Sequence, residues 1–249
     1  MTRDPRMPGG RPGLYRKLRL RHARFSSRYP AISWKRWTLG TLLLITLAAF
    51  FIDRPAIGWV RSEPLWLREF AADITDAGKS GWILVSSAII GIGLHLAGRR
   101  PMLRARRLAS MRVVHACIFI FFSVAGSGLL ANLAKRAIGR ARPTMLEELG
   151  PFSFHSFAHD YDFESFPSGH GTTDGALAMA LALLFPAFRV PFLLTGFLLA
   201  ITRTLVGAHY PSDVIGGFSF GVWFTLMMAV LFARHGILIK GTVPGHRPG

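Results

Sequence analysis

The chain has 249 residues, of which 51% are hydrophobic, and its formal net charge is +17. Length alone allows one or two domains, and the single cysteine, Cys117, excludes an intrachain disulfide bond. The positive charge would suit a nucleic-acid-binding protein, but much of it lies in the N-terminal arm, next to an apolar segment. We therefore expect the arm to meet anionic lipid headgroups, and we predict no nucleic-acid partner.

Six uncharged apolar runs follow the arm, and each is a candidate membrane helix. The second, third and sixth are long enough to cross a hydrocarbon core of about 30 Å at about 1.5 Å per residue. The other three are shorter, and we expect the fourth to start near Ser168 and the fifth to run on to Val206. The alternative for the short runs is a set of buried helices in a soluble protein. The six runs are Trp37–Ile52, Ser80–Gly98, Val113–Ala134, Gly175–Phe188, Val190–Thr202 and Val214–Ala233.

This pattern predicts an all-α fold, an integral membrane bundle of six transmembrane helices with a short loop domain on its outer face. Residues 1–36 carry eleven Lys or Arg, and residues 99–112 carry six with no acidic residue. Because Lys and Arg concentrate in short cytoplasmic loops, we expect both segments inside. The predicted units are a cytoplasmic arm (1–36), a six-span domain (37–235) and a cytoplasmic tail (236–249), in a bacterial-type inner membrane.

Three short polar segments carry residues suited to phosphate chemistry. Cations neutralise the non-bridging oxygens of a phosphate, the backbone N–H groups of a Ser-Gly turn can cradle them, and histidines can act as nucleophile and proton carrier. The predicted topology places all three segments at the face away from the cytoplasm. The segments are K-R-A-I-G-R-A-R-P from Lys135 to Pro143, P-S-G-H from Pro167 to His170, and Thr202 to Asp213 with Arg203 and His209 inside it.

Together these segments closely resemble the signature of the type-2 phosphatidic acid phosphatase family, K-x6-R-P, then P-S-G-H, then S-R-x5-H-x3-D. Lys135 is followed by six residues before Arg142, and Arg203 by five before His209 and three more before Asp213. The one departure is Thr202, which stands where the family has Ser and keeps a hydroxyl. The resemblance implies an integral membrane lipid phosphatase that works through a phosphohistidine.

Residue chemistry and resemblance assign the same roles. His209 attacks phosphorus, Asp213 holds its other ring nitrogen, and His170 protonates the leaving group and then activates water. Asp174 lies one helical turn after His170 and could tune it or pair with a motif cation. The sequence contains no metal-ligand motif, so we predict no metal and no cofactor. The expected phosphate ligands are Lys135, Arg142, Arg203, Ser168 and Gly169, and the expected supporting residues are Asp174, Thr202, Pro143 and Pro167.

Several alternatives stay open at this stage. The substrate could be a phosphatidate, a phosphatidylglycerophosphate, a polyprenyl diphosphate or a lipid A phosphate, because the motifs address only the phosphate. Another lipid could replace water as the acceptor, or the chain could be an inactive scaffold or lipid transporter. Residues 144–166 form a lid or a plain connector. Gly217 and Gly221 form a G-x-x-x-G pair that predicts close helix packing within one chain or in an oligomer.

Overall fold

The computed structural model describes residues 33–101 and 103–235, so most of the predicted basic arm and all of the predicted tail lie outside the described residues. The described residues form helices and no strand, with one isolated β-bridge between Arg140 and Phe154. In chain order the α-helices are α2 (Trp34–Phe51), α3 (Asp53–Ser62), α4 (Leu65–Thr75), α5 (Ser80–Ala97), α6 (Arg104–Ile138), α7 (Leu146–Leu149), α8 (Gly169–Leu184), α9 (Arg189–Leu205) and α10 (Pro211–Arg234).

Each of the six predicted apolar runs lies mainly in a helix, namely α2, α5, α6, α8, α9 or α10, although the fourth run ends beyond α8, in the 3-10 turn Pro186–Phe188. Helix α8 begins directly after Ser168, as expected, and α9 ends one residue before Val206. Among the described residues, four helical stretches are long and apolar enough to cross a membrane. Helices α2 and α3 together, bent by 54°, would make a fifth. The 16 residues of α8 keep it below this length criterion, although it packs in the same bundle.

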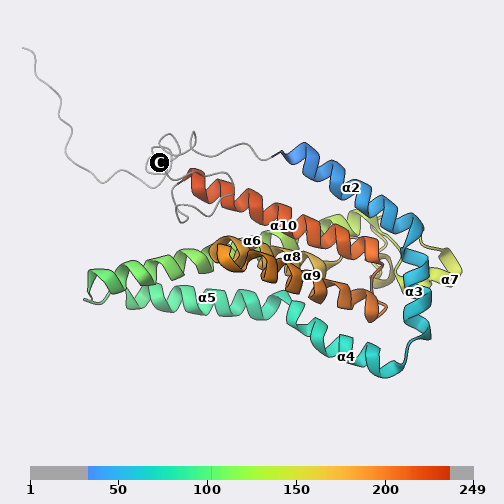
Figure 1. Ribbon diagram of the computed structural model, residues 1–249, viewed down its shortest axis with the longest axis horizontal. Coiled ribbons are helices and arrows are strands. Elements are labelled where there is room, and N and C mark those ends of the chain that lie inside the picture. The colour runs from blue at the N-terminus through green and yellow to red at the C-terminus, as the bar shows by residue number, and fades with distance from the viewer. Residues whose placement is uncertain (1–32, 102, 236–249) are drawn as a thin grey trace, which may run out of the picture.

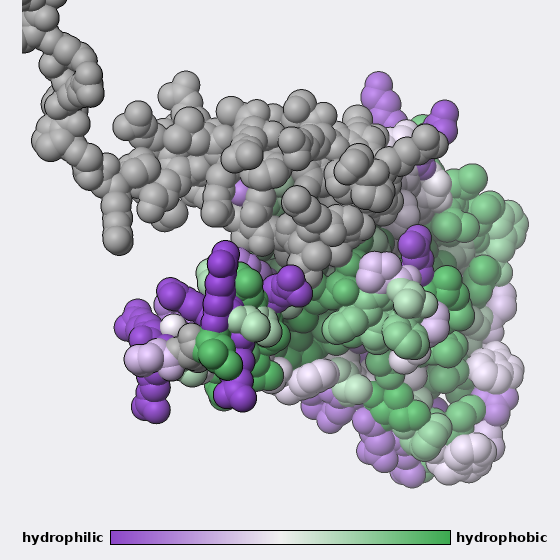
Figure 2. Space-filling view, turned by 60° about the vertical axis from the view of Figure 1, so that its left-hand side comes forward, coloured by the Kyte–Doolittle hydropathy of each residue, from purple (hydrophilic) through white to green (hydrophobic). Residues whose placement is uncertain are grey.

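The long helices run roughly alongside one another, with α10 and α2 on one side and α5 on the other (Figure 1). Helices α3 and α7 and the loops between α6 and α8 gather at one end of the bundle, whereas the turn between α5 and α6 lies at the opposite end. Hydrophobic side chains cover much of the face shown in Figure 2, which is what helices in contact with lipid require. The described part of the molecule therefore has a broad apolar surface between two ends that carry the connections.

Helices α8 and α10 pack closely because two glycines of α10 leave room for the backbone of α8. A Cβ atom at Gly217 would lie 2.3 Å from the carbonyl oxygen of Ser168, and one at Gly221 would lie 2.1 Å from that of Thr172. The G-x-x-x-G pair is thus used within the chain. This contact fixes the start of α8 against the first turns of α10.

A glycine also ends α6 and turns the chain into the loop region. Gly139 has a φ of 64°, and a Cβ atom there would lie 2.0 Å from the carbonyl oxygen of His155. Only glycine fits such a left-handed, crowded position. The returning loop is held by backbone hydrogen bonds from His155 to Gly139 and from Ser165 to Arg140. Residues 139–167 are consequently a folded cap over this end of the bundle.

Candidate active site

The three motifs meet at the end of the bundle that carries the cap. Lys135 lies in the last turn of α6, His170 in the first turn of α8, and Arg203 in the last turn of α9. His209 lies in the short connection to α10. Lys135 is 7% exposed and His209 is 2% exposed, so both side chains are almost fully removed from solvent. Four elements thus present histidines and cations to one small region.

Three buried polar atoms of this region have no hydrogen-bond partner among the described residues. They are Nε2 of His170, Nε of Arg203 and Nδ1 of His209. Buried polar atoms in folded proteins are nearly always paired, so a cluster of unpaired ones indicates a place for a ligand. A Cβ atom at Gly169 would lie 3.7 Å from Nζ of Lys135, so this cation reaches the start of α8, where His170 lies. A phosphate would supply acceptors for His170 and Arg203, whereas Nδ1 of His209 faces Asp213.

Arg142 is anchored more firmly than the sequence indicated. Its guanidinium donates from Nε to the carbonyl of Tyr161, from Nη1 to that of Ala208 and from Nη2 to that of Glu164. It also lies 3.8 Å from the centre of the Tyr161 ring. Three of its five N–H groups are therefore used inside the protein. Arg142 ties the cap to the site and keeps two N–H groups, one on each terminal nitrogen, for an anion.

The Ser168-Gly169 turn is arranged as a helix N-terminus. The Ser168 hydroxyl oxygen accepts a hydrogen bond from the N–H of Gly171, and the Ser168 N–H donates to the carbonyl of Asp213. The backbone N–H of Ser168 is thus already used, contrary to the expectation that it could bind phosphate. The Ser168 hydroxyl and the unpaired N–H of Gly169 remain as donors.

Asp213 faces His209 across a gap that is longer than a hydrogen bond. Its Oδ2 lies 3.8 Å from Nδ1 of His209, which is an ion-pair distance. The same oxygen accepts from the Ser165 hydroxyl at 2.6 Å and from the N–H of Tyr210 at 3.0 Å. Asp213 is therefore held by its own partners and is placed to stabilise a positive charge on the imidazole.

Sequence reasoning missed a buried network behind Asp213. Nη1 of Arg140 donates to Oδ1 of Asp213 at 2.6 Å, and Nη2 donates to Oδ2 of Asp53 at 2.8 Å. Asp53 also accepts from the N–H and the hydroxyl of Ser212. Arg140 is 4% exposed and both carboxylates are fully buried. One guanidinium thus joins the start of α3 to the start of α10.

The structure gives each of the expected supporting residues a different set of contacts. Thr202 donates from Oγ1 to the carbonyl of Leu199 at 2.6 Å, one turn back in α9. Asp174 is 4% exposed and packs against Gly78, but no ion pair joins it to a motif cation in the part of the chain that the structure describes. Pro143 accepts from Arg61 through its carbonyl, and Pro167 precedes the α8 cap.

The electrostatics of the site favour a neutral His209. Full burial, helped by the charges of Arg142 and Lys135, lowers the pKa of His209 to about 3, although nearby Asp213 acts in the opposite direction. A neutral imidazole has a free lone pair, which a nucleophile needs. The site therefore leaves this imidazole neutral, with a free lone pair, at physiological pH.

Residues 116–237 match the sequence profile of the PAP2 superfamily. A lipid A 1-phosphatase of Rhizobium johnstonii is 43% identical over 212 residues, which is 85% of this chain and 86% of the relative. The chain belongs to this superfamily. A phosphatidylglycerophosphatase B of Bacillus subtilis is 27% identical over 169 residues, 63% of this chain and 71% of the relative. The crystal structure of a transmembrane PAP2-type phosphatidylglycerolphosphate phosphatase from Bacillus subtilis shares the fold. The two structures superpose with a TM-score of 0.53 at 22% sequence identity, and the match covers 77% of this chain and 93% of the other chain.

Proposed function

We propose that this PAP2-type membrane lipid phosphatase removes the phosphate from a lipid in two steps through a phosphohistidine at His209. The observation that carries the proposal is the pair of buried, unpaired atoms on His170 and Arg203, at the end of the bundle where His209 also lies. Such an arrangement suits an anion that is held between cations and two imidazoles. Water would be the final acceptor of the phosphoryl group.

In the first step, Nε2 of His209 would form a bond to phosphorus while the bond from phosphorus to the lipid oxygen breaks. Nε2 is the attacking atom because Nδ1 faces Asp213. With the negative charge of the bound phosphate beside it, His170 would be protonated and would give that proton to the departing oxygen. The charge that develops on the His209 ring would be stabilised by the Asp213 carboxylate, which Arg140 and Ser165 hold in place.

In the second step, a water oxygen would attack phosphorus and the bond to His209 would break. His170, now neutral, would take the proton of that water, which returns both histidines to their starting states. Lys135, Arg142 and Arg203 would stabilise the charge on the non-bridging oxygens in both steps. No step needs a metal ion, and metal-free catalysis stays a prediction.

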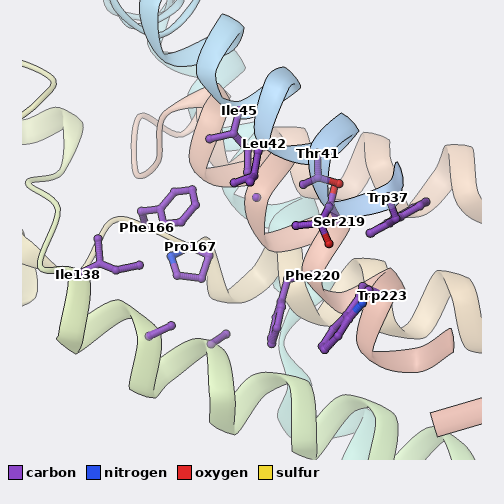
Figure 3. A pocket seen from close by; sticks show the side chains of 14 residues that line it. Trp37, Thr41, Leu42, Ile45, Ile138, Phe166, Pro167, Ser219, Phe220 and Trp223 are labelled. Carbon is purple, nitrogen blue, oxygen red and sulfur yellow. The ribbon is translucent and has the colours of Figure 1, made fainter. Parts of the chain in front are cut away.

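A groove beside the site supports a substrate with a hydrocarbon chain. It has a volume of about 330 Å³ and lies between α2, α6 and α10. Phe166 and Pro167 mark one end, directly before the Ser168 cap, and Trp37 and Trp223 mark the other (Figure 3). From Gly216 to Trp223 the groove follows α10 for roughly 10 Å at about 1.5 Å per residue. An acyl chain in this groove would leave its headgroup near the cap.

Among lipid phosphates, we propose the 1-phosphate of lipid A as the substrate, because the relative that shares 43% identity over most of both chains is named for that activity. The experiment is phosphate release by purified protein in detergent, with His209→Ala as the control. The panel contains lipid A, phosphatidylglycerophosphate, undecaprenyl diphosphate and a soluble phosphate monoester. We expect the highest kcat/KM with lipid A. A clear preference for another lipid would contradict the substrate, and a preference for the soluble ester would contradict lipid specificity.

Lipid-to-lipid transfer is a separate outcome of the same assay. When the phosphate of the donor lipid is radiolabelled and unlabelled lipid acceptors are present, a hydrolase releases the label as inorganic phosphate. A phosphotransferase would instead move the label to the second lipid. Recovery of most label in the acceptor would contradict water as the acceptor.

We also propose six crossings, with α8 as the shortest, and a site that faces away from the cytoplasm. The support is the arginine-rich turn between α5 and α6, which lies at the opposite end of the bundle from the motifs. In a Cys117→Ala background, a membrane-impermeant thiol reagent added outside should label His155→Cys and spare Leu103→Cys. Labelling of position 103 from outside would contradict this orientation.

A further inference from the structure

The turn between α5 and α6 carries a dense positive charge at the end of the molecule that the catalytic proposal does not use. Residues 99–112 contain six arginines and no Asp or Glu. Arg99 and Arg107 have exposed side chains, and neither forms an ion pair within the described part of the chain. Hydrophilic side chains gather at one end of the molecule beside a broad hydrophobic surface in Figure 2.

Two hollows between α5 and α6 continue one another at this end. The first has a volume of about 370 Å³, and its lining includes Arg99, Arg107 and Ser110. The second, of about 450 Å³, is almost entirely apolar, and its lining includes Ala88, Gly91, Cys117 and Phe121. Three residues line both hollows, so they form one continuous groove with a basic mouth and an apolar floor. The shared residues are His95, Val114 and Ile118.

The length of the groove suits a lipid molecule. From Arg107 to Phe122 along α6 it extends for roughly 22 Å at about 1.5 Å per residue. One leaflet contributes about half of the 30 Å hydrocarbon core, and the headgroup adds to that. Helix α5 packs chiefly against α6, so the groove opens outward, away from the other helices.

We propose that this groove is a binding site for an anionic phospholipid, distinct from the site that processes the substrate. Arg99 and Arg107 bind the headgroup phosphate, and one acyl chain lies along Val114 and Ile118 towards Phe121. Guanidinium groups suit phosphate because their parallel N–H groups can form paired, charge-assisted hydrogen bonds. Zwitterionic lipids lack the net charge that complements this mouth. The inference does not rest on the proposed reaction, because the groove shares no residue with the three motifs.

The general tendency of arginines to lie in cytoplasmic loops provides the competing explanation for this charge. The same arginine-rich stretch offers a matched control, because Arg104 and Arg106 lie in the first turn of α6 but do not line either hollow. Arg99→Gln with Arg107→Gln removes two charges from the mouth. Arg104→Gln with Arg106→Gln removes the same charge next to it. Loop charge alone affects both pairs equally, whereas a built site affects only the first.

The test is native mass spectrometry of the detergent-solubilised full chain, titrated with phosphatidylglycerol or phosphatidylcholine of the same acyl chains. Each basic residue near an anionic surface contributes roughly a factor of five in binding, so the first pair should weaken phosphatidylglycerol binding about 25-fold. The second pair should change it less than about fivefold. Ile118→Trp, which fills the junction of the hollows, should weaken binding with all six arginines present.

Any of three results would overturn the proposal. They are equal affinity of the native chain for both lipids, equal losses for the two arginine pairs, or undiminished phosphatidylglycerol binding by Ile118→Trp. Melting temperature in detergent and phosphatase activity verify that each variant is folded, since none of these substitutions touches a residue of the three motifs.

Discussion

Replacement of Arg140 by Met tests whether the buried network supports both the fold and the site. Met keeps an unbranched, apolar side chain at this position but removes the charge and all of the donors of arginine. Arg140 is 4% exposed, and its partners Asp53 and Asp213 are fully buried. Without the guanidinium, two carboxylates would remain in the interior and lose hydrogen bonds of 2.8 Å and 2.6 Å.

The expected loss of stability is large because this one substitution leaves two buried carboxylates without their cation. Removal of one partner of a buried pair typically lowers the free energy of unfolding by about 3–5 kcal/mol. We expect the upper end of this range, about 5 kcal/mol, because one cation serves two carboxylates. At about 1.4 kcal/mol per factor of ten, that is more than a thousandfold in the folding equilibrium. Arg136→Met is the matched control, since Arg136 is 63% exposed and its pair with Glu164 spans 3.6 Å. Its effect should stay below about 1 kcal/mol.

The assay combines thermal unfolding in detergent with steady-state kinetics. Arg140→Lys should fold, but a single ammonium group cannot repeat the two bonds, so kcat should fall more than KM changes. Because the main penalty of Arg140→Met is unpaired negative charge, a second substitution, Asp53→Asn, should restore part of the lost stability. If Arg140→Met melts and turns over like the native chain, Arg140 does not position Asp213 and the reasoning fails. Strictly additive losses in the double variant would contradict the charge explanation.

Three further predictions concern the site. Replacement of any one motif cation by Ala should slow phosphate release by about 10²–10³-fold without loss of membrane insertion. Arg203→Lys should recover only part of the rate. A native rate for Arg203→Ala would mean that Arg203 binds no phosphate. Thr202→Ser should leave kcat/KM within about twofold, because its hydroxyl serves only a carbonyl bond within α9, and a large loss would assign Thr202 a role in the site. The pKa of His209 is about 3 when folded, below the ordinary value of 6.5, so the unfolded chain binds the extra proton. His209 should therefore reduce stability as pH falls from about 6.5 towards 3, and His209→Gln should flatten that slope in pH-dependent melting. An unchanged slope in that variant would contradict the buried, neutral imidazole.

The helices that cross the apolar region could be predicted from the sequence because length and absence of charge are sufficient signals there. The residues at which these helices begin and end could not be predicted. Helix α6 begins at Arg104, nine residues before the uncharged run that starts at Val113, since arginines extend a helix into the headgroup region without breaking it. Helices α3 and α4 were missed because their mixed charges and short length resemble a loop.

The motif residues could be predicted as a set, because their order and spacing are specific. The contacts that hold these motif residues in place could not be predicted. Arg140 stands inside the K-x6-R-P motif and looked like a spacer residue. Asp53 is 159 residues away from Ser212, and no spacing rule links such distant positions. The carbonyl bonds of Arg142 likewise depend on how the cap folds back, which only the tertiary structure shows.

The central claim is that the phosphoryl group passes through His209, and trapping the intermediate tests it most directly. Protein mixed with lipid labelled with ³²P on its phosphate is quenched within milliseconds and examined for protein-bound label. The account predicts protein-bound label that is stable to base, labile to acid and absent from His209→Ala. With a diphosphate lipid, whose leaving group departs without a proton, the label should be stronger in His170→Ala than in the native chain. Protein-bound label that persists in His209→Ala would contradict the account, as would full turnover by that variant.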